Sequence, residues 1–233
     1  MNLNKFKKEL TVIILCGGKG LRLRPITKNI PKPLIKINEK SILENIIRFF
    51  LKYKINNFII VTGYKHKLID QFINNKFRKH NIRTLYTGLN TDIIRRIEKA
   101  SFYSKKYSLI CYGDTMIDLD LNKYFKFYIS NIKKVLIASY QLKSNFGILN
   151  IVKNDNVVKF DEKPILDLWF NVGYIIFSSE KFDYFKKFKK FQNLLKYLSK
   201  NKIMKAYKHR GKHITINTIS ELEKAKEEIK KFN

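Results

Sequence analysis

Apolar residues gather into short runs in the first half of the chain. Residues 10–16 form an unbroken run, Leu-Thr-Val-Ile-Ile-Leu-Cys, and residues 58–61 and 107–112 form two similar runs. Runs of this length without polar alternation are typical of strands that are covered on both faces. We therefore predict three buried strands here and a fourth strand over residues 135–140.

Between these runs the apolar positions take the spacing of an amphipathic helix. Ser41 and Glu44 stand at the two positions of a capping box, which predicts that a helix begins here and continues to about residue 54. Residues 66–77 form a second predicted helix. The apolar positions that share one face of the first helix are Ile42, Ile46, Phe49 and Phe50.

Strands that alternate with helices predict an α/β fold, with a mostly parallel central sheet and helices on both of its faces. In such sheets a ligand binds beyond the carboxyl ends of the strands. The residues that follow Cys16, Val61 and Tyr112 are therefore the first places to search for a functional site.

The pattern changes after Asn145, where residues 146–152 and 157–160 predict a β-hairpin that turns at residues 154–156. The chain shows no internal repeat and no linker, so we predict one Rossmann-like domain over residues 1–233 with a small β-hairpin insertion. Three further elements are predicted: a strand over 169–177, a basic helix over 180–200, and a closing helix over 219–232 capped by Thr218 or Ser220.

The formal net charge of the chain is +29. Such a charge attracts nucleic acid, an anionic membrane surface or small phosphorylated substrates. The lysines are spread along the chain together with abundant Asn and Ile, so we interpret most of them as solvated surface residues. A nucleic-acid partner is the less favoured alternative.

No apolar run approaches the roughly 20 residues that a membrane-spanning helix needs. We therefore expect no membrane partner and a cytoplasmic location. Cys16 and Cys111 follow apolar runs and belong to no Cys-x-x-Cys motif, so we expect two buried free thiols in a reducing compartment.

The first predicted strand runs into a loop with the sequence Gly-Gly-Lys-Gly-Leu-Arg over residues 17–22. Glycines let backbone N–H groups approach an anion closely, and the arginine adds a planar pair of donors for phosphate. The loop lacks the third glycine of the dinucleotide motif and the Gly-Lys-Ser/Thr of a P-loop. Downstream, Lys32 stands between Pro31 and Pro33, and the second proline predicts an extended backbone that aims this lysine.

The glycine loop followed by Pro-Lys-Pro resembles the signature of the sugar-1-phosphate nucleotidyltransferase family. The resemblance covers nearly the whole chain, since residues 112–120, 160–164 and 169–174 are each similar to a further motif of that family. It implies a single nucleotidyltransferase domain with a nucleotide-binding half over residues 1–120 and an acceptor-binding half over residues 121–233. It also implies transfer of a nucleoside monophosphate to a sugar-1-phosphate, with release of pyrophosphate.

The resemblance also assigns roles to individual residues. Arg22 and Lys32 are expected to hold the triphosphate, Asp114 to bind Mg²⁺, and Lys163 to contact the acceptor phosphate. Asn171 and Gly173 are expected to line the acceptor pocket. The other expected nucleotide-binding residues are Leu15, Gly17, Gly18, Gly20, Leu21, Gly88, Thr91 and Gly113.

Several details are most similar to the glucose-1-phosphate cytidylyltransferase branch of the family. They are Thr87-Gly88 followed by Thr91, Asp118-Leu119-Asp120, the pair Phe146-Gly147, and residues 206–209 with Gly211. This similarity implies CTP as the favoured nucleotide. We also expect the chain to form a homo-oligomer.

Three departures from the family pattern affect the expected site. Leu21 replaces a threonine or serine and removes a hydroxyl near the phosphates, and residues 92–94 lack the glycines expected after Thr91. Asn217 stands where the branch has its second metal-binding aspartate, which implies a weakened metal site. A catalytically silent regulatory relative, or a transferase that uses UTP, dTTP or GTP, therefore stays open as an alternative.

Overall fold

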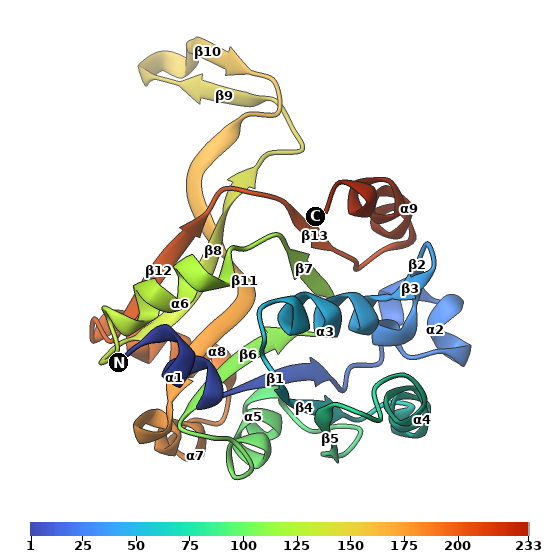
Figure 1. Cartoon of the computed structure of the whole chain (residues 1–233). Coiled ribbons are helices and arrows are strands. Elements are labelled where there is room, and N and C mark those ends of the chain that lie inside the picture. Colours follow the sequence, from blue (N-terminus) through green and yellow to red (C-terminus); the bar gives the residue numbers. More distant parts are fainter. Residues whose placement is uncertain (233) are drawn as a thin grey trace.

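The computed structural model describes residues 1–232, and a seven-stranded sheet forms the centre of this part of the chain (Figure 1). The strand order is β12-β8-β11-β6-β1-β4-β5, and within residues 1–232 β11 alone runs against the other strands of this sheet. The strands are β1 (Leu10–Cys16), β4 (Asn57–Thr62), β5 (Asn81–Tyr86), β6 (Tyr107–Tyr112), β8 (Val135–Lys143), β11 (Ile165–Ser178) and β12 (Met204–His209). The mostly parallel sheet predicted from the sequence is confirmed.

Helices cover both faces of the sheet, as the alternation of elements predicts. Val12 and Ile14 of β1 pack into the core on one face, whereas Ile13 packs with Ala100 on the other. The first face carries α1 (Leu3–Lys8), α3 (Ile42–Lys52), α4 (His66–Lys76) and α6 (Leu121–Ile129), and α9 (Ile219–Glu228) adds Leu222 and Ala225 to the same core. The second face carries α5 (Ile93–Ser101), α7 (Asp183–Lys187) and α8 (Phe191–Lys200). Because both faces are covered, the central strands β1, β4 and β6 are mostly apolar and buried.

Short elements join the main ones close to the carboxyl ends of the strands. The antiparallel pair β7 (Thr115–Ile117) and β13 (His213–Thr215) brings the chain near its end back beside the segment after β6. Before α3 lie α2 (Ile26–Asn29) and the antiparallel pair β2 (Lys36–Ile37) and β3 (Lys40–Ser41).

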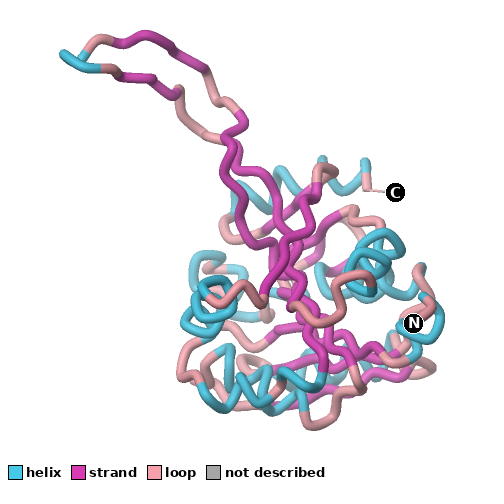
Figure 2. Tube along the Cα trace, turned by 90° about the vertical axis from the view of Figure 1, so that its left-hand side faces the viewer, coloured by secondary structure: helices cyan, strands magenta, loops and turns pink. Residues whose placement is uncertain are grey.

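A two-stranded arm, residues 144–164, projects from the body of the molecule (Figures 1 and 2). It contains β9 (Ile148–Ile151) and β10 (Val157–Asp161), which pair antiparallel, and it continues from the ends of β8 and β11. The predicted hairpin is confirmed, but it stands away from the sheet. Most of its apolar side chains are exposed: Phe146, Ile148, Leu149, Ile151, Val152, Val157, Val158 and Phe160.

The start of α3 forms half of the predicted capping box. The Ser41 side chain accepts a hydrogen bond from the backbone N–H of Glu44, as expected. The Glu44 carboxylate, however, is bound by Arg48 at 3.0 Å and Lys76 at 2.7 Å, and these bonds tie α3 to α4. They lower the pKa of Glu44 against the opposing effect of burial. The helix ends at Lys52 because Lys54 takes a φ of 61°.

The single basic helix predicted over residues 180–200 is wrong. The structure has α7 and α8 in this region, separated at Phe188, whose backbone is extended. The Arg95 guanidinium donates to the carbonyl oxygens of Phe185 at 3.1 Å and Phe188 at 3.2 Å. A continuous helix would use the Phe185 carbonyl for its own next turn, so the arginine replaces that bond.

Burial of the two cysteines matches the sequence interpretation, since Cys16 and Cys111 are both buried free thiols. Burial raises the pKa of Cys16 well above its usual value and that of Cys111 to about 12. Across the described chain, none of the helices combines the length and the apolar character that a membrane crossing demands.

His213 gives the fold a pH-sensitive contact. Its ring packs against Tyr140 at 5.2 Å and Phe170 at 5.3 Å between centroids. Burial, with a smaller effect from His209, lowers the pKa of His213 from 6.5 to about 4. Folding therefore favours the neutral ring, and stability falls as the pH drops from 6.5 through 4, because the unfolded chain then binds the extra proton.

We predict that this loss of stability is smaller in the His213→Gln variant. A pKa shift of this size corresponds to about 3 kcal/mol between neutral pH and pH 4. Urea unfolding of both proteins at a series of pH values measures the difference. Parallel pH curves for the two proteins would contradict the prediction.

Candidate functional site

A cavity of about 940 Å³ opens beyond the carboxyl ends of β1 and β6. This is the edge of the sheet where the strand pattern predicts a ligand site. The cavity is lined by residues 15–23, 32–33, 89–93 and 112–114, together with Arg96 and Asn217.

The glycine loop forms one wall of this cavity. Gly20 has a φ of 61°, a conformation that glycine adopts without steric cost, and its carbonyl accepts a hydrogen bond from the Thr27 hydroxyl at 2.9 Å. The Tyr64 hydroxyl in turn donates to the Thr27 carbonyl at 2.9 Å. Leu21 lies on the cavity and is 56% exposed, so the position that usually carries a hydroxyl is apolar here.

In the cavity, the cationic side chains of Lys32 and Arg22 bind oxygen atoms of residues that are distant in the sequence. The Lys32 ammonium donates to Asp114 Oδ2 at 2.5 Å and to Asn217 Oδ1 at 3.1 Å. Arg22 Nη2 donates to the same Asn217 oxygen at 2.9 Å. The structure therefore brings together the four residues that the sequence analysis assigned to the triphosphate and the metal.

The backbone at Lys32 differs from the extended conformation predicted from Pro33. Lys32 begins a short 3-10 helix, Lys32–Leu34, and the extended residue is Pro31. Two hydrogen bonds close this turn, from Leu34 N to the Pro31 carbonyl at 2.8 Å and from Ile35 N to the Lys32 carbonyl at 3.1 Å. These hydrogen bonds outweigh the preference for an extended backbone that a following proline imposes on Lys32. The side chain still points at Asp114.

The position of Asn217 is fixed by β13, which precedes it, and by α9, which follows it. The Ile216 N–H donates to the Asp114 carbonyl at 3.2 Å, so the strand end before Asn217 lies beside Asp114. Thr218 caps α9 with a complete capping box, and Glu221 of that box also accepts from the Asn217 N–H at 2.5 Å. The amide side chain is therefore held at the cavity by the start of the closing helix.

The expected acceptor-binding residues lie outside this cavity. Asn171 donates to the Tyr112 hydroxyl at 3.3 Å, and a Cβ at Gly173 would lie 2.3 Å from the Tyr112 ring. Both residues therefore support Tyr112, which lines the cavity, from behind. Lys163 lies on the arm with a φ of 47°, and its nearest charged partner is Glu162 at 3.5 Å.

Three of the residues that resemble the cytidylyltransferase branch, Asp118, His209 and Gly211, form a separate cluster. His209 Nε2 lies 2.9 Å from Asp118 Oδ1, and a Cβ at Gly211 would lie 2.2 Å from the same oxygen. This packing explains the spacing of His209 and Gly211 in the sequence. None of these three residues lines the cavity.

Among the cavity residues that the sequence analysis did not assign to the site is Arg96. Its guanidinium is buried and lines the cavity from below the glycine loop. Arg96 lies on the buried side of α5, next to Ile97 and four residues before Ala100. A charge within the apolar stripe of an amphipathic helix is the signal that could have identified it.

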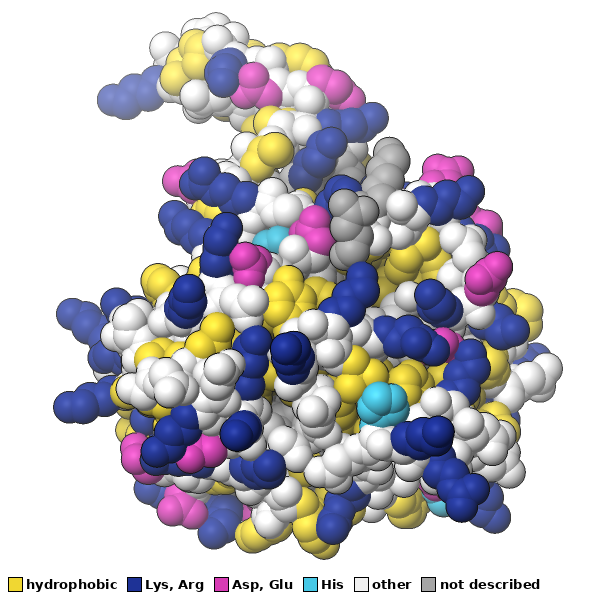
Figure 3. All heavy atoms as spheres, in the orientation of Figure 1, with side chains coloured by type: hydrophobic (Ala, Val, Ile, Leu, Met, Phe, Trp, Pro, Cys, Tyr) yellow, Lys and Arg dark blue, Asp and Glu magenta, His cyan; other side chains and the backbone are white. Residues whose placement is uncertain are grey.

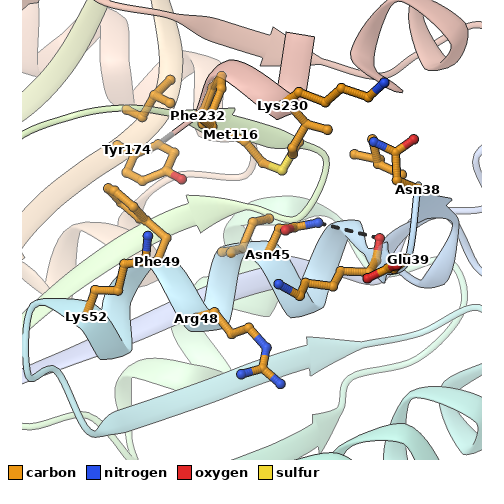
Figure 4. A pocket seen from close by; sticks show the side chains of 15 residues that line it. Asn38, Glu39, Asn45, Arg48, Phe49, Lys52, Met116, Tyr174, Lys230 and Phe232 are labelled. Atoms are coloured by element: carbon orange, nitrogen blue, oxygen red, sulfur yellow. Dashed lines mark hydrogen bonds between the residues drawn. The ribbon is translucent and has the colours of Figure 1, made fainter. Parts of the chain in front are cut away.

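A second cavity of about 460 Å³ lies between α3, the β2–β3 turn and the end of the chain (Figure 4). Its floor includes Phe49, Met116 and Tyr174, and Lys52 and Lys230 stand at its edges. It contains none of the glycine loop and none of the predicted site residues. We therefore place the candidate active site in the first cavity.

Lysine and arginine side chains are scattered over the molecular face shown in Figure 3 and do not form one continuous patch. This distribution agrees with the interpretation of most of the +29 charge as solvated surface residues.

Comparisons with known proteins agree with this geometry. The profile of the nucleotidyl transferase family matches residues 11–220. A Bacillus subtilis protein described as a probable glucose-1-phosphate cytidylyltransferase is 30% identical over 241 aligned residues, which cover 91% of this chain and 93% of that protein. The D-glycero-alpha-D-manno-heptose 1-phosphate guanylyltransferase of Campylobacter jejuni is 31% identical over 156 residues, covering 66% of this chain and 69% of that protein.

The fold is also shared with solved structures. A Bacillus anthracis structure, whose description proposes a glucose-1-phosphate thymidylyltransferase, superposes with a TM-score of 0.77. It is 18% identical and covers 96% of each chain. Taken with the family profile and the relatives, this similarity shows that the chain belongs to the nucleotidyl transferase family and is a sugar-1-phosphate nucleotidyltransferase.

Proposed function

We propose that this chain transfers CMP from CTP to a sugar-1-phosphate and releases pyrophosphate. The observation that carries the proposal is the meeting of Arg22, Lys32 and Asp114 at the glycine loop. The similarity to the Bacillus subtilis relative over 91% of the chain supports CTP. The guanylyltransferase relative makes GTP the principal competitor.

In the proposed reaction a phosphate oxygen of the acceptor attacks the α-phosphorus of the nucleotide. A new P–O bond forms there as the bond from the α-phosphorus to the bridging oxygen breaks, and that oxygen leaves with pyrophosphate. Catalysis of such a transfer rests on positioning and on cations where negative charge develops. The glycine loop would hold the nucleotide, with Arg22 and Lys32 neutralising its phosphates.

The residues present fit one magnesium ion that arrives with the triphosphate. Asp114 Oδ2 and Asn217 Oδ1 both converge on the Lys32 ammonium, so the two oxygens already share one cation position. Within residues 1–232 no group of three or more His, Cys, Asp and Glu could hold a metal ion. Mg²⁺ commonly keeps waters and binds through one or two carboxylates and substrate phosphates. An ion held by Asp114 and Asn217 would neutralise phosphate charge.

Two variants test this assignment of the metal site. Asn217→Asp should lower the magnesium concentration needed for half-maximal activity, because a carboxylate attracts the ion more strongly than an amide. Asp114→Asn should abolish activity, because it removes the proposed carboxylate ligand. Magnesium titrations of activity for the wild type and both variants measure the effect. An active Asp114→Asn protein would place the metal elsewhere, with Asp118 or Asp120 as the next candidates.

A nucleotide panel tests the proposed substrate. CTP should give the fastest release of pyrophosphate with glucose 1-phosphate, when compared in direct competition with UTP, GTP, ATP and dTTP. Lys32→Ala should lower turnover about 100-fold or more while leaving the fold intact, since an aimed cation stabilises the transition state by several kcal/mol.

The panel also separates the alternatives. A preference for another triphosphate would overturn the choice of CTP alone. Turnover of Lys32→Ala within a factor of two of the wild type would overturn the assigned site. Absence of turnover with every triphosphate and sugar phosphate would favour a regulatory relative, and retention of DNA or RNA that nucleotides do not displace would favour a nucleic-acid binder.

We also propose that the chain is a homo-oligomer whose copies meet through the arm. The arm carries three lysines and three acidic residues and is therefore neutral, in a chain with a net charge of +29. In the arm, Phe146 is 77% exposed and Phe160 is 60% exposed. An isolated hairpin is only marginally stable in water, and a large exposed apolar surface marks an interaction site. A second copy meets the least charge repulsion here.

Replacing Phe146 and Phe160 together with serine should shift the protein to a smaller species. Phe102→Ser is the matched control, because Phe102 is 67% exposed on the body of the molecule, far along the chain from the arm. Sedimentation velocity at several protein concentrations measures both variants. A wild type that stays monomeric at all concentrations would contradict the proposal.

A further inference from the structure

Arg96 is a buried arginine whose hydrogen bonds go to neutral groups. Its side chain belongs to α5, and the residue is only 5% exposed. Among the described residues its partners are five backbone carbonyls and one hydroxyl. The bonds run from Nε to Thr91 O (3.0 Å), from Nη1 to Thr62 O (2.9 Å) and Thr87 Oγ1 (2.6 Å), and from Nη2 to Gly88 O (2.9 Å), Leu89 O (3.3 Å) and Gly17 O (3.4 Å).

These partners come from three separate segments that meet at the cavity. Gly17 begins the glycine loop, Thr62 ends β4, and residues 87–91 form the loop after β5. A guanidinium group has five donors in a fixed planar arrangement, so one side chain can hold three segments at set distances. Two of the three segments, the glycine loop and residues 89–91, line the cavity directly.

Two glycines, Gly17 and Gly63, pack so closely against this guanidinium that a larger residue would clash with it. A Cβ at Gly17 would lie 2.2 Å from Arg96 Nη1, and its three nearest neighbours would all be Arg96 atoms. A Cβ at Gly63 would lie 2.8 Å from the same nitrogen. The first glycine of the loop is therefore required by the arginine beneath it, whereas a Cβ at Gly18 would meet open space.

The neighbouring Arg95 differs from Arg96 because it is paired with a carboxylate. Its guanidinium also donates to two carbonyls, those of Phe185 and Phe188, but it is paired with Glu98 at 2.5 Å and ties α5 to α7. Arg95 is not part of the cavity lining. Burial lowers the pKa of Arg96 from its ordinary value, yet arginine stays charged in proteins. Arg96 is therefore a charged group at the cavity, and Asp92, which also lines the cavity, is the acidic residue whose charge acts on it.

We propose that Arg96 is a positioning residue of the nucleotide site, which holds the glycine loop and residues 87–91 in the arrangement that binds the triphosphate. This inference rests on the proposed function, because it assigns the cavity to a nucleotide. It predicts that loss of the guanidinium weakens nucleotide binding and leaves the chemical step largely unchanged, since Arg22, Lys32 and Asp114 are untouched.

The first test separates KM from kcat. Arg96→Lys keeps the charge but loses the planar donors, and it should raise the KM for CTP at least about tenfold while kcat changes by less than about threefold. Arg95→Met is the matched control and should leave the KM within a factor of two, even if it lowers stability. An unchanged KM in Arg96→Lys, or an equal rise in Arg95→Met, would overturn the proposal.

The second test does not depend on activity. Gly17→Ala should lower the urea midpoint of the wild type, because the new Cβ meets Arg96. In the Arg96→Ala background the same substitution should lower the midpoint much less, since the clashing atoms are gone. Equal losses in both backgrounds would show that the glycine and the arginine are not coupled.

Calorimetry of CTP binding in the presence of Mg²⁺ tests the role of Arg96 separately from the proposed transfer reaction. Weaker binding in Arg96→Lys, with no turnover by any protein, would sustain the role of Arg96 while refuting the proposed transfer reaction. If the panel identifies a different triphosphate, the same KM comparison is made with that nucleotide. Equal affinity of the wild type and Arg96→Lys for the nucleotide that binds refutes the role of Arg96.

Discussion

The parallel pairing of β1 with β4 on one side and β6 on the other is the constraint on which the rest of the structure depends. Leu15 is in register with Val61 and with Tyr112, so the three strands end at the same edge. Because β1 is buried on both faces, its pairing is specified by packing from two layers of helices. The loops that follow these strands therefore meet above one edge, and the glycine loop is the central one.

The close approach of these strand ends restricts the residues that can stand there. A Cβ at Gly113 would lie 2.6 Å from the Leu15 carbonyl, and a Cβ at Gly63 would lie 2.7 Å from the Gly17 carbonyl. Both positions are glycines because another backbone passes beside them. The same crowding surrounds one large buried group, the Arg96 guanidinium, which donates to a carbonyl of each loop that meets there.

Charge balance gives the cavity its chemical character. Arg22 and Lys32 share the oxygen of a neutral amide, Asn217, and a single carboxylate, Asp114, contacts Lys32. An aspartate at position 217 would cancel much of the remaining positive charge. With the amide, the cavity keeps an excess of positive charge that suits an anionic triphosphate. We therefore expect Asn217 to favour binding of the nucleotide over binding of the free metal ion.

The residues expected to bind the acceptor lie farther from the cavity. Asn171 and Gly173 act on the cavity through Tyr112, and Lys163 stands on the arm beyond the sheet. Motifs that lie close to one another along the chain are therefore separated in space, because β11 is long and passes from the arm into the centre of the sheet.

Local sequence determined the elements and the position of the site. Apolar runs specified β1, β4 and β6, and glycines after β1 marked the loop, because burial and backbone freedom depend on residue type at each position. Family motifs indicated Arg22, Lys32 and Asp114. The sequence did not predict which residues distant along the chain contact one another. Asn217 meets Lys32 across 185 residues, and Arg96 meets Gly17 across 79. Such contacts, like the break between α7 and α8 at Arg95, exist only once the sheet has brought distant segments together, so the tertiary structure alone decided them.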